Sequence, residues 1–455
     1  MRLRSLLPSN IKLNALYWSL PLFLYLVASQ STLVFKGWYV AILSAVNIFM
    51  LVAFYLQFPL AARLKNSILF SHIDWGVTKH KKIGQLIGIF FFLHPLLIIL
   101  PKFFLSPADG MRAMDLMLFS SNAHTLTGII AWVGLIIWVL LSIFKDKLPM
   151  KYETWKLTHL LGFIFIAIFA TLHVTQVGRH GQMQPELNLI WWVLCALCCY
   201  SMLYNYLLKP HKIKNNTFSL KSVKKVSLSD WDLTLTLAPN TRFNFKAGQF
   251  VWLSTDKESS PLQAHPFSIA STSHNLPDMS FIIRDLGDYT SHLDELKIGQ
   301  DVYIDGPYGQ LTLDKSNKFT AITLIAGGVG IGPMLGLLRE LAQRQDTRQI
   351  RLIYANQSIK QMVYQQEIQS LTKTLAHFSQ YLVTEQETAE EQKIEGPIYH
   401  GYINVQIIQD CVGDQNIKDH AFYLCGPKPM VMAVNKQLSQ LKVPRKNIYF
   451  EQLAF

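Results

Sequence analysis

Long apolar segments fill the first 208 residues of the chain, and shorter apolar runs broken by polar residues fill the rest. A helix needs roughly 20 apolar residues to cross a bilayer, and six of the segments approach that length. They lie at 14–34, 38–58, 83–101, 122–144, 157–177 and 188–208, and the third is the shortest. This pattern predicts a bundle of six transmembrane helices over residues 1–210.

The second half of the chain reads as soluble protein with two kinds of fold. Residues 211–315 contain short runs such as DLTLTL, QFVWLS and DVYIDG between turn signals, which predict a small antiparallel β-barrel. Residues 316–455 open with a buried-strand run, a glycine-rich turn and a helical run, namely TAITLIA, AGGVGIGP and MLGLLRELAQ. That succession is typical of an α/β domain with a parallel sheet. We therefore expect a multi-domain membrane protein.

Positive charge is distributed unevenly among the predicted loops. The formal net charge is +12, but no soluble basic patch is interleaved with aromatic residues, so we expect no nucleic-acid partner. Lysine and arginine gather before the first apolar segment and in every second loop after it, at Arg2, Arg4, Lys12, Arg63, Lys65, Lys79, Lys81, Lys82, Lys145, Lys147, Lys151, Lys156, Lys209, Lys212 and Lys214. Because positive residues mark the cytoplasmic side, we expect a multi-pass protein in the lipid bilayer of the cell (inner) membrane, with both termini cytoplasmic.

Four histidines occupy matching positions in the third and fifth predicted helices. His80 and His94 are separated by 13 residues, and so are His159 and His173. Fourteen helical residues rise about 21 Å and return to nearly the same face, so the two pairs define two levels in the bilayer. Imidazole is a common axial ligand of haem iron, and ionisable groups at membrane depth are usually functional. Two haems, one at each level, fit this spacing better than four histidines that merely cap helices or bond carbonyls.

Two groups of motifs in the soluble half suit a flavin and a nicotinamide nucleotide. HPFSIAS at the junction of two predicted strands, Arg284 and the segment GDYT offer rings, hydroxyls and a guanidinium to a ligand that is part flat ring and part pyrophosphate. The loop GGVGIGP precedes a helix, whose N-terminus favours phosphate. Cys425 ends a strand at the edge where such sheets bind ligands. By composition alone, these are also ordinary strand and loop residues.

With these motifs in this order, the chain resembles the NADPH oxidase and ferric reductase superfamily over nearly its whole length. The resemblance implies a six-helix ferric-reductase-like domain at 1–210, an FAD-binding β-barrel at 211–315 and a Rossmann-like NAD(P)-binding α/β domain at 316–455. It implies two haems b with His80, His94, His159 and His173 as metal ligands. It implies that FAD lies against His265, Pro266, Phe267, Ser268, Arg284, Gly287, Tyr289 and Thr290. NADPH or NADH would lie against Gly327, Gly328, Gly330, Gly332, Pro333, Cys425, Gly426 and Pro427.

Three residues are implied to act at the hydride step. Ser268 would lie near flavin N5, Cys425 would lie beside the nicotinamide, and Phe455 would cover the flavin and move aside for nicotinamide. Gln357 stands where relatives often carry an arginine for the 2′-phosphate, and Lys360 is an alternative donor. The choice between NADPH and NADH therefore stays open.

The implied activity is that of a transmembrane NAD(P)H oxidase or ferric reductase, which passes electrons from the cytoplasm to an outer acceptor. We favour dioxygen, reduced to superoxide, over a ferric chelate or a periplasmic partner protein, and a haem-binding sensor or a transporter is a more distant alternative. His124, Arg179 and His180 fall on the outer side. They are candidates for binding haem propionates or guiding an acceptor, and equally for being solvated loop residues.

Overall fold

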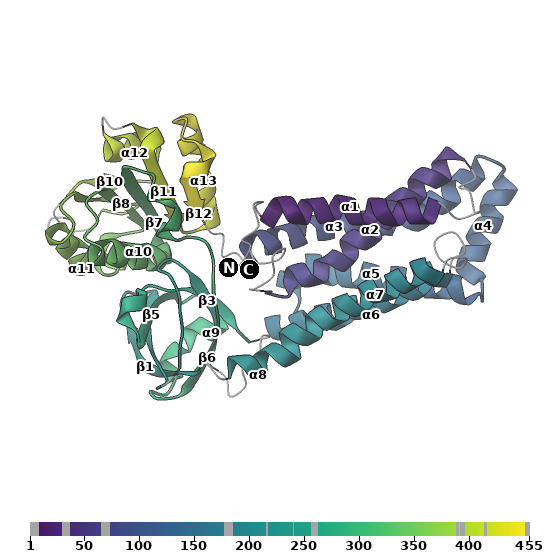
Figure 1. Cartoon of the computed structure of the whole chain (residues 1–455), viewed down its shortest axis with the longest axis horizontal. Helices are drawn as coiled ribbons and strands as arrows, with labels where there is room; N and C mark the ends of the chain where they lie inside the picture. The colour runs from purple at the N-terminus through teal and green to yellow at the C-terminus, as the bar shows by residue number, and fades with distance from the viewer. Residues whose placement is uncertain are drawn as a thin grey trace. The chain divides into compact units, whose positions relative to one another are not determined.

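The computed structural model describes residues 9–29, 37–64, 73–176, 185–214, 217–239, 241–255, 263–387, 391, 396–413 and 416–450. The chain divides into two compact units, Met1–Lys209 and Pro210–Phe455. Figure 1 shows helices throughout the first unit and two sheets in the second.

Six helices of the first unit are long and apolar enough to cross a membrane. They are α1 (Ser9–Ser29), α2 (Trp38–Ala61), α3 (Ile73–Phe103), α5 (Ala123–Ile143), α6 (Tyr152–Gln176) and α7 (Pro185–Leu203). The predicted six-helix bundle is confirmed. After α7 the chain continues through a π-helical turn at Tyr204–Leu208 into α8 (Lys209–Ile213).

The largest differences from the predicted bounds in this unit concern the third and the first helix. The third helix was expected to be the shortest but is 31 residues long, because its polar first turns from Ile73 to Lys82 continue the helix before the apolar run begins. Apolarity marks the part of a helix that needs lipid, whereas the backbone hydrogen bonds do not require it. The first helix ends at Ser29 rather than at residue 34, and residues 30–36 lie outside the described residues.

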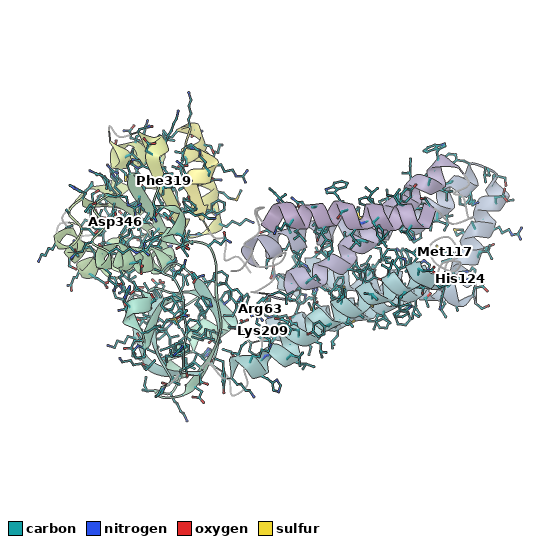
Figure 2. The ribbon with its side chains drawn as sticks, in the orientation of Figure 1. Arg63, Met117, His124, Lys209, Phe319 and Asp346 are labelled. Carbon is teal, nitrogen blue, oxygen red and sulfur yellow. The ribbon has the colours of Figure 1, made fainter. Side chains whose placement is uncertain are left out.

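A short helix, α4 (Pro107–Phe119), lies between α3 and α5 and was not predicted. Ser106 caps it, since its hydroxyl accepts a hydrogen bond of 3.0 Å from the Asp109 N–H, and Pro107 takes the first helical position. A capping serine followed by proline is a helix-start signal in the sequence. Figure 2 shows Met117 of α4 and His124 of α5 at one end of the unit, with Arg63 and Lys209 at the other end.

The outside of this unit carries large exposed apolar side chains, as expected for a surface that faces lipid. Trp18 is 70% exposed, Leu189 is 64% exposed and Ile89 is 62% exposed. Inside, Trp191 and Tyr55 are fully buried, and the Tyr55 hydroxyl lies 2.6 Å from the Thr171 hydroxyl across α2 and α6. A buried polar pair of this kind satisfies itself where no water is available.

The first sheet of the second unit is antiparallel, as predicted. Its strand order is β4-β3-β6-β1-β2-β5, from β1 (Thr217–Lys225), β2 (Asp230–Leu237), β3 (Phe250–Ser254), β4 (His265–Ser268), β5 (Asp278–Arg284) and β6 (Asp301–Tyr308), with the short helix α9 (Asp288–Ser291) after β5. An isolated bridge links Ile269, directly after β4, to Phe281 in the middle of β5, and closure into a barrel stays a prediction.

HPFS forms strand β4 instead of the predicted junction between strands. His265 to Ser268 pair antiparallel with Phe250 to Leu253. Proline inside a run argues against a central strand. Strand β4 lies at an edge of the sheet, where the missing N–H of Pro266 is tolerated.

The second sheet is parallel, with the order β10-β9-β8-β7-β11-β12. Its strands are β7 (Ala321–Gly327), β8 (Gln349–Asn356), β9 (Phe378–Thr384), β10 (Ile398–His400), β11 (His420–Cys425) and β12 (Ile448–Phe450). Helices α10 (Ile331–Gln343) and α11 (Gln365–Ser370) cover one face, and α12 (Val405–Val412) and α13 (Lys428–Gln440) cover the other (Figure 1). The predicted α/β domain with a parallel sheet is confirmed.

The chain order of the parallel strands reverses at β7. Strand β8 follows on one side of β7, and β11 lies on the other side. Open α/β sheets bind ligands outside the carboxyl ends of the strands at such a switch point. The carboxyl ends here are Gly327 of β7 and Cys425 of β11.

Candidate functional site

His80 of α3 and His159 of α6 face each other inside the membrane unit. Their ring centroids are 6.3 Å apart, and the ring planes meet at 68°. Two imidazole nitrogens bonded to one metal atom lie about 4 Å apart, because each metal–nitrogen bond is about 2 Å. A separation of 6.3 Å between centroids has the length that one metal atom between the two rings requires when a nitrogen of each ring points toward it, whereas in this structure the rings meet edge to face. Nδ1 of His80 is buried and has no hydrogen-bond partner within the described residues.

The imidazole of His159 is anchored on one side only. Its Nδ1 lies 3.0 Å from the Ser142 hydroxyl, and that hydroxyl donates to the Trp138 carbonyl at 2.7 Å. Because the Ser142 proton is committed to Trp138, its oxygen is left to accept the Nδ1 proton of His159. Nε2 then keeps its lone pair for a metal, which is how metal-bound histidines are usually oriented.

His173 is anchored in the same way at the other level. Its Nδ1 lies 2.7 Å from the carbonyl oxygen of His124 in α5, and a carbonyl can only accept, so Nδ1 carries the proton. Gly128 makes room for this ring, since a Cβ there would lie 2.6 Å from His173 Nδ1. His94 of α3 packs beside Phe90 and Phe91 at 6.3 and 6.1 Å between ring centroids.

The predicted outer residues have different outcomes. His124 contributes its backbone carbonyl to His173, a contact that no property of its own side chain indicates. Arg179 and His180 lie outside the described residues. Phe455 lies outside them as well.

Three aromatic rings of the flavin motifs form one stack. Tyr289 stacks on His265 with 4.2 Å between centroids and 23° between planes. Phe267 lies 6.2 Å from Tyr289 and nearly parallel to it. Ser268 follows on the same strand, opposite Phe250. Flat rings in parallel offer a face on which another flat ring can pack.

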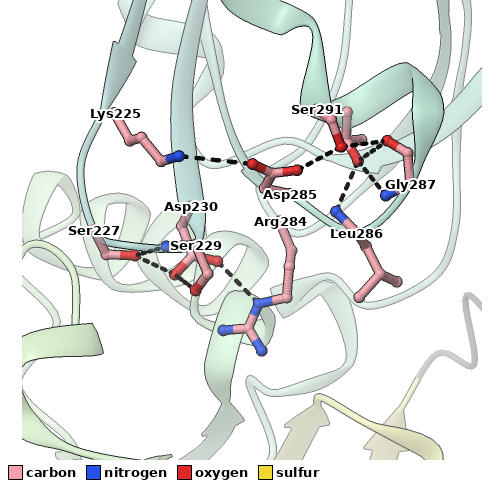
Figure 3. Close-up of polar contacts among 10 residues, drawn as sticks. Lys225, Ser227, Ser229, Asp230, Arg284, Asp285, Leu286, Gly287 and Ser291 are labelled. Carbon is pink, nitrogen blue, oxygen red and sulfur yellow. Dashed lines mark hydrogen bonds and ion pairs between the residues drawn. The ribbon is translucent and has the colours of Figure 1, made fainter.

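Arg284 ends β5, and the turn that contains GDYT follows it in the chain (Figure 3). The Thr290 hydroxyl accepts hydrogen bonds from the N–H groups of Leu286 and Gly287 at 2.9 and 3.1 Å, which fixes the turn. Arg284 Nε donates to Asp230 at 3.1 Å. Nη2 of Arg284 is buried without a partner in the described part of the chain, which is what an anionic ligand would satisfy.

The two predicted nicotinamide motifs are brought into contact. A Cβ at Gly330 would lie 2.2 Å from the Cys425 carbonyl oxygen, and one at Gly327 would lie 3.1 Å from Pro427 Cδ. Gly426 has a φ of 159°. Gly332 and Pro333 lie in the first turn of α10, so the glycine loop ends at a helix N-terminus that suits phosphate.

An ion pair that also bonds the other sheet was not predicted, and we call it the Arg339 clamp, formed by Arg339, Glu367 and the Ala270 carbonyl. Arg339 of α10 bonds Glu367 twice, at 2.6 and 2.7 Å, and donates to the Ala270 carbonyl at 2.8 Å. Ala270 lies two residues after Ser268. Beside the clamp, Tyr364 donates to Asp232 of β2. Burial raises the pKa of Tyr364, and the carboxylate raises it further, so the hydroxyl keeps its proton.

Asp230, Ser142 and Arg339 are functional candidates that the sequence did not reveal. Each is a common residue type outside the motifs, and each acquires its role from a partner distant in the chain: Arg284, His159 and Glu367 respectively. The one local signal is SLSD at 227–230, a turn sequence with hydroxyls before an acid.

Three family models match the chain in succession. The model described as "Ferric reductase like transmembrane component" matches residues 40–170. "FAD-binding domain" matches residues 217–312, and "Oxidoreductase NAD-binding domain" matches residues 324–436. The matched ranges contain His80, His94 and His159, the flavin motifs and the nicotinamide motifs, and His173 lies just beyond the first range.

Curated relatives and solved structures resemble parts of the chain. It is 29% identical over 250 residues to the 2-halobenzoate 1,2-dioxygenase electron transfer component of Burkholderia cepacia, which covers 53% of this chain and 69% of that protein. It is 29% identical over 221 residues to the propane 2-monooxygenase reductase component of Mycolicibacterium goodii, covering 47% and 60%. A flavohemoglobin structure from Malassezia yamatoensis is 17% identical, covers 82% of this chain and 96% of that one, and has a TM-score of 0.49. The chain thus spans roughly two thirds of the length of these two curated relatives.

Proposed function

The chain belongs to the NADPH oxidase and ferric reductase superfamily, and we propose that it moves electrons from NAD(P)H through FAD to two haems b, and from there to an acceptor. The family matches establish a transmembrane oxidoreductase with FAD- and NAD(P)H-binding domains. The haems, their ligands, the direction across the membrane and the acceptor are the proposal.

The observation that carries it is the facing pair His80 and His159, 6.3 Å apart between centroids. Ser142 holds Nδ1 of His159, and the His124 carbonyl holds Nδ1 of His173. Both α6 histidines can therefore present Nε2 toward α3, where His80 and His94 lie. The equal spacing of the pairs supports one haem at each level.

The residues of the soluble unit support the entry of electrons. When bound, FAD accepts a hydride from NAD(P)H and gives up electrons singly, and the haems carry single electrons. Phe267 and Tyr289 offer a packing face to the flavin ring, Ser268 offers a hydroxyl, and Arg284 offers its free Nη2 to the pyrophosphate. The loop from Gly327 to Gly330 and the Cys425–Pro427 segment would hold the nicotinamide nucleotide. Phe455 is proposed to cover the flavin until nicotinamide displaces it.

We propose that the bundle spans 1–210 and that both termini are cytoplasmic, since the basic loops alternate. Electrons would then leave at the end where α4 and α5 meet. The four paired histidines would hold the two haems, and transfer of an electron to dioxygen, which would give superoxide, would need no bond between iron and the acceptor.

A second candidate acceptor is a ferric chelate or a partner protein. The two relatives above are, by name, an electron transfer component and a reductase component of oxygenases, which favours delivery of electrons to a separate protein. A haem-binding sensor or a transporter would show no steady consumption of NAD(P)H.

Anaerobic absorption spectra of the purified protein test the electron path. With FAD present, NADPH should reduce a b-type spectrum that corresponds to two haems per chain. His159→Ala and His173→Ala should each remove one haem, whereas His211→Ala, outside the paired levels, should remove none. Loss of haem only on replacing a histidine outside the pairs would refute the ligand assignment.

The acceptor is tested in air with the same preparation. Superoxide dismutase should suppress most dye reduction if dioxygen is the acceptor. Dye reduction at the same rate with and without superoxide dismutase, together with faster NADPH consumption when ferric chelate is added, would exclude oxidase activity and support ferric reductase activity.

A further inference from the structure

Arg284 is held from behind by a buried carboxylate. Its Nε donates to Asp230 Oδ1 at 3.1 Å, and the Asp230 side chain is only 2% exposed. The other oxygen of Asp230 accepts from the Ser227 hydroxyl at 2.6 Å and from the Ser229 hydroxyl at 3.3 Å. Figure 3 shows the two ends of the guanidinium pointing away from this cluster. Asp230 therefore fixes the direction in which the guanidinium of Arg284 points.

The guanidinium of Arg284 lies against Gly328 of the nicotinamide loop. Gly328 has a φ of +53°, and a Cβ there would lie 3.0 Å from Nη2, 3.1 Å from Nη1 and 3.2 Å from Cζ of Arg284. All three nearest atoms belong to this one guanidinium. The space that a side chain at position 328 would need is thus occupied by an arginine from the other sheet.

We propose that Arg284 is shared by the two nucleotide sites, and that Asp230 is the positioning residue that lets it serve both. Arg284 reaches the FAD pyrophosphate with the buried Nη2, and its guanidinium lies flat on the backbone of Gly328. The glycine at 328 is then required by the flavin-site arginine as well as by the nicotinamide phosphate. This inference rests on the proposed roles of Arg284 and the Gly327–Gly330 loop.

A consequence is that a change in the nicotinamide loop weakens flavin binding. Gly328→Ala puts a methyl group against the guanidinium and pushes it from the pyrophosphate. A charge-assisted hydrogen bond lost in this way corresponds to about tenfold in affinity or more. Alanine at positive φ also strains the loop itself, and the two effects must be separated.

A double-mutant cycle separates them. FAD is titrated into flavin-free full-length protein, and its dissociation constant is read from the quenching of FAD fluorescence. Gly328→Ala should weaken FAD binding about tenfold in the parent. In the Arg284→Ala background it should change the constant less than about twofold, because the group it displaces is gone. An equal effect in both backgrounds, or none in the parent, would overturn the inference.

Asp230→Asn tests the positioning role. It keeps the shape of the side chain but weakens the hold on Nε, and FAD affinity should fall about tenfold. At saturating FAD, the KM for NADPH should rise as well, because the same guanidinium packs against Gly328 of the nicotinamide loop. Asp278→Asn is the matched control, since Asp278 is paired with Lys221 on the same sheet and does not touch Arg284. A loss of thermal stability with unchanged FAD affinity would assign Asp230 a structural role only.

These outcomes are distinguishable from failure of the proposed function. The titration uses neither haem reduction nor an acceptor, so an incorrect haem or acceptor assignment leaves it unaffected. Parent protein that binds no FAD at all would refute the proposed function and not merely the coupling.

Discussion

Gly128→Ala should remove the haem held by His173 while leaving the other in place. A Cβ at position 128 would lie 2.6 Å from Nδ1 and 2.7 Å from Cε1 of His173. Real Cβ atoms do not approach that closely, so the imidazole must swing away from α5. The swing breaks its 2.7 Å hydrogen bond to the His124 carbonyl. Loss of an orienting partner of a metal ligand typically costs 10–100-fold in metal affinity.

The assay is the haem content per chain of the purified protein, measured as the pyridine haemochrome. We expect about half of the parent value, with reductive spectra of a single remaining haem. Gly134→Ala is the control in the same helix, because its Cβ would meet Ile166 Cγ1 at an ordinary 3.4 Å. Two haems per chain with unchanged midpoint potentials in Gly128→Ala would refute the placement of His173 as a ligand.

Three further predictions concern the soluble unit. Arg339→Met should lower the thermal unfolding midpoint, followed by released-FAD fluorescence, because Glu367 loses both bonds of a bidentate pair; an unchanged midpoint would mean that the clamp adds nothing. Burial lowers the pKa of His420 to about 4, so the native state favours the neutral ring. The contribution of the neutral His420 ring to the free energy of unfolding should be fully present above pH 6.5 and should be lost as the pH falls toward 4. His420→Asn should reduce the difference between the thermal midpoints at pH 7 and pH 5. Gln357→Arg, at the end of β8, should lower KM for NADPH about tenfold while KM for NADH stays constant, because a guanidinium binds a phosphate bidentately; equal changes for both coenzymes would contradict it.

The features that the sequence predicted are those encoded over short distances. The H-x13-H spacing placed four histidines on two helices, and the structure brings the rings of His80 and His159 to 6.3 Å between centroids, edge to face. Strand-like runs followed by glycine loops predicted the parallel sheet, and Gly327 and Cys425 do end neighbouring strands. Helical period and strand period are properties of consecutive residues, so neither required knowledge of the fold.

What the sequence could not predict depends on partners far apart in the chain or on position in a sheet. HPFS was placed at a junction between strands, whereas it forms β4, and the edge position of β4 is what makes Pro266 acceptable in a strand. The first turns of α3 are rich in polar residues, so no periodic pattern of apolar residues indicates that the helix begins there. Arg339 and Glu367 are 28 residues apart, and they come together only because α10 and α11 pack on the same face of the parallel sheet.

The unpredicted residues share a physical logic with the predicted ones. The Ser142 hydroxyl and the His124 carbonyl each accept a hydrogen bond from Nδ1 of a histidine, and Asp230 accepts one from Nε of Arg284. In each case the neighbour hydrogen-bonds one nitrogen of the side chain, and the remaining nitrogen atoms are left for the proposed cofactor. The type of a functional residue follows from chemistry and can be read in sequence. The direction in which that side chain points depends on a neighbour of a common residue type, so replacing a hydrogen-bonding neighbour such as Asp230 should weaken cofactor binding through the residue that it orients.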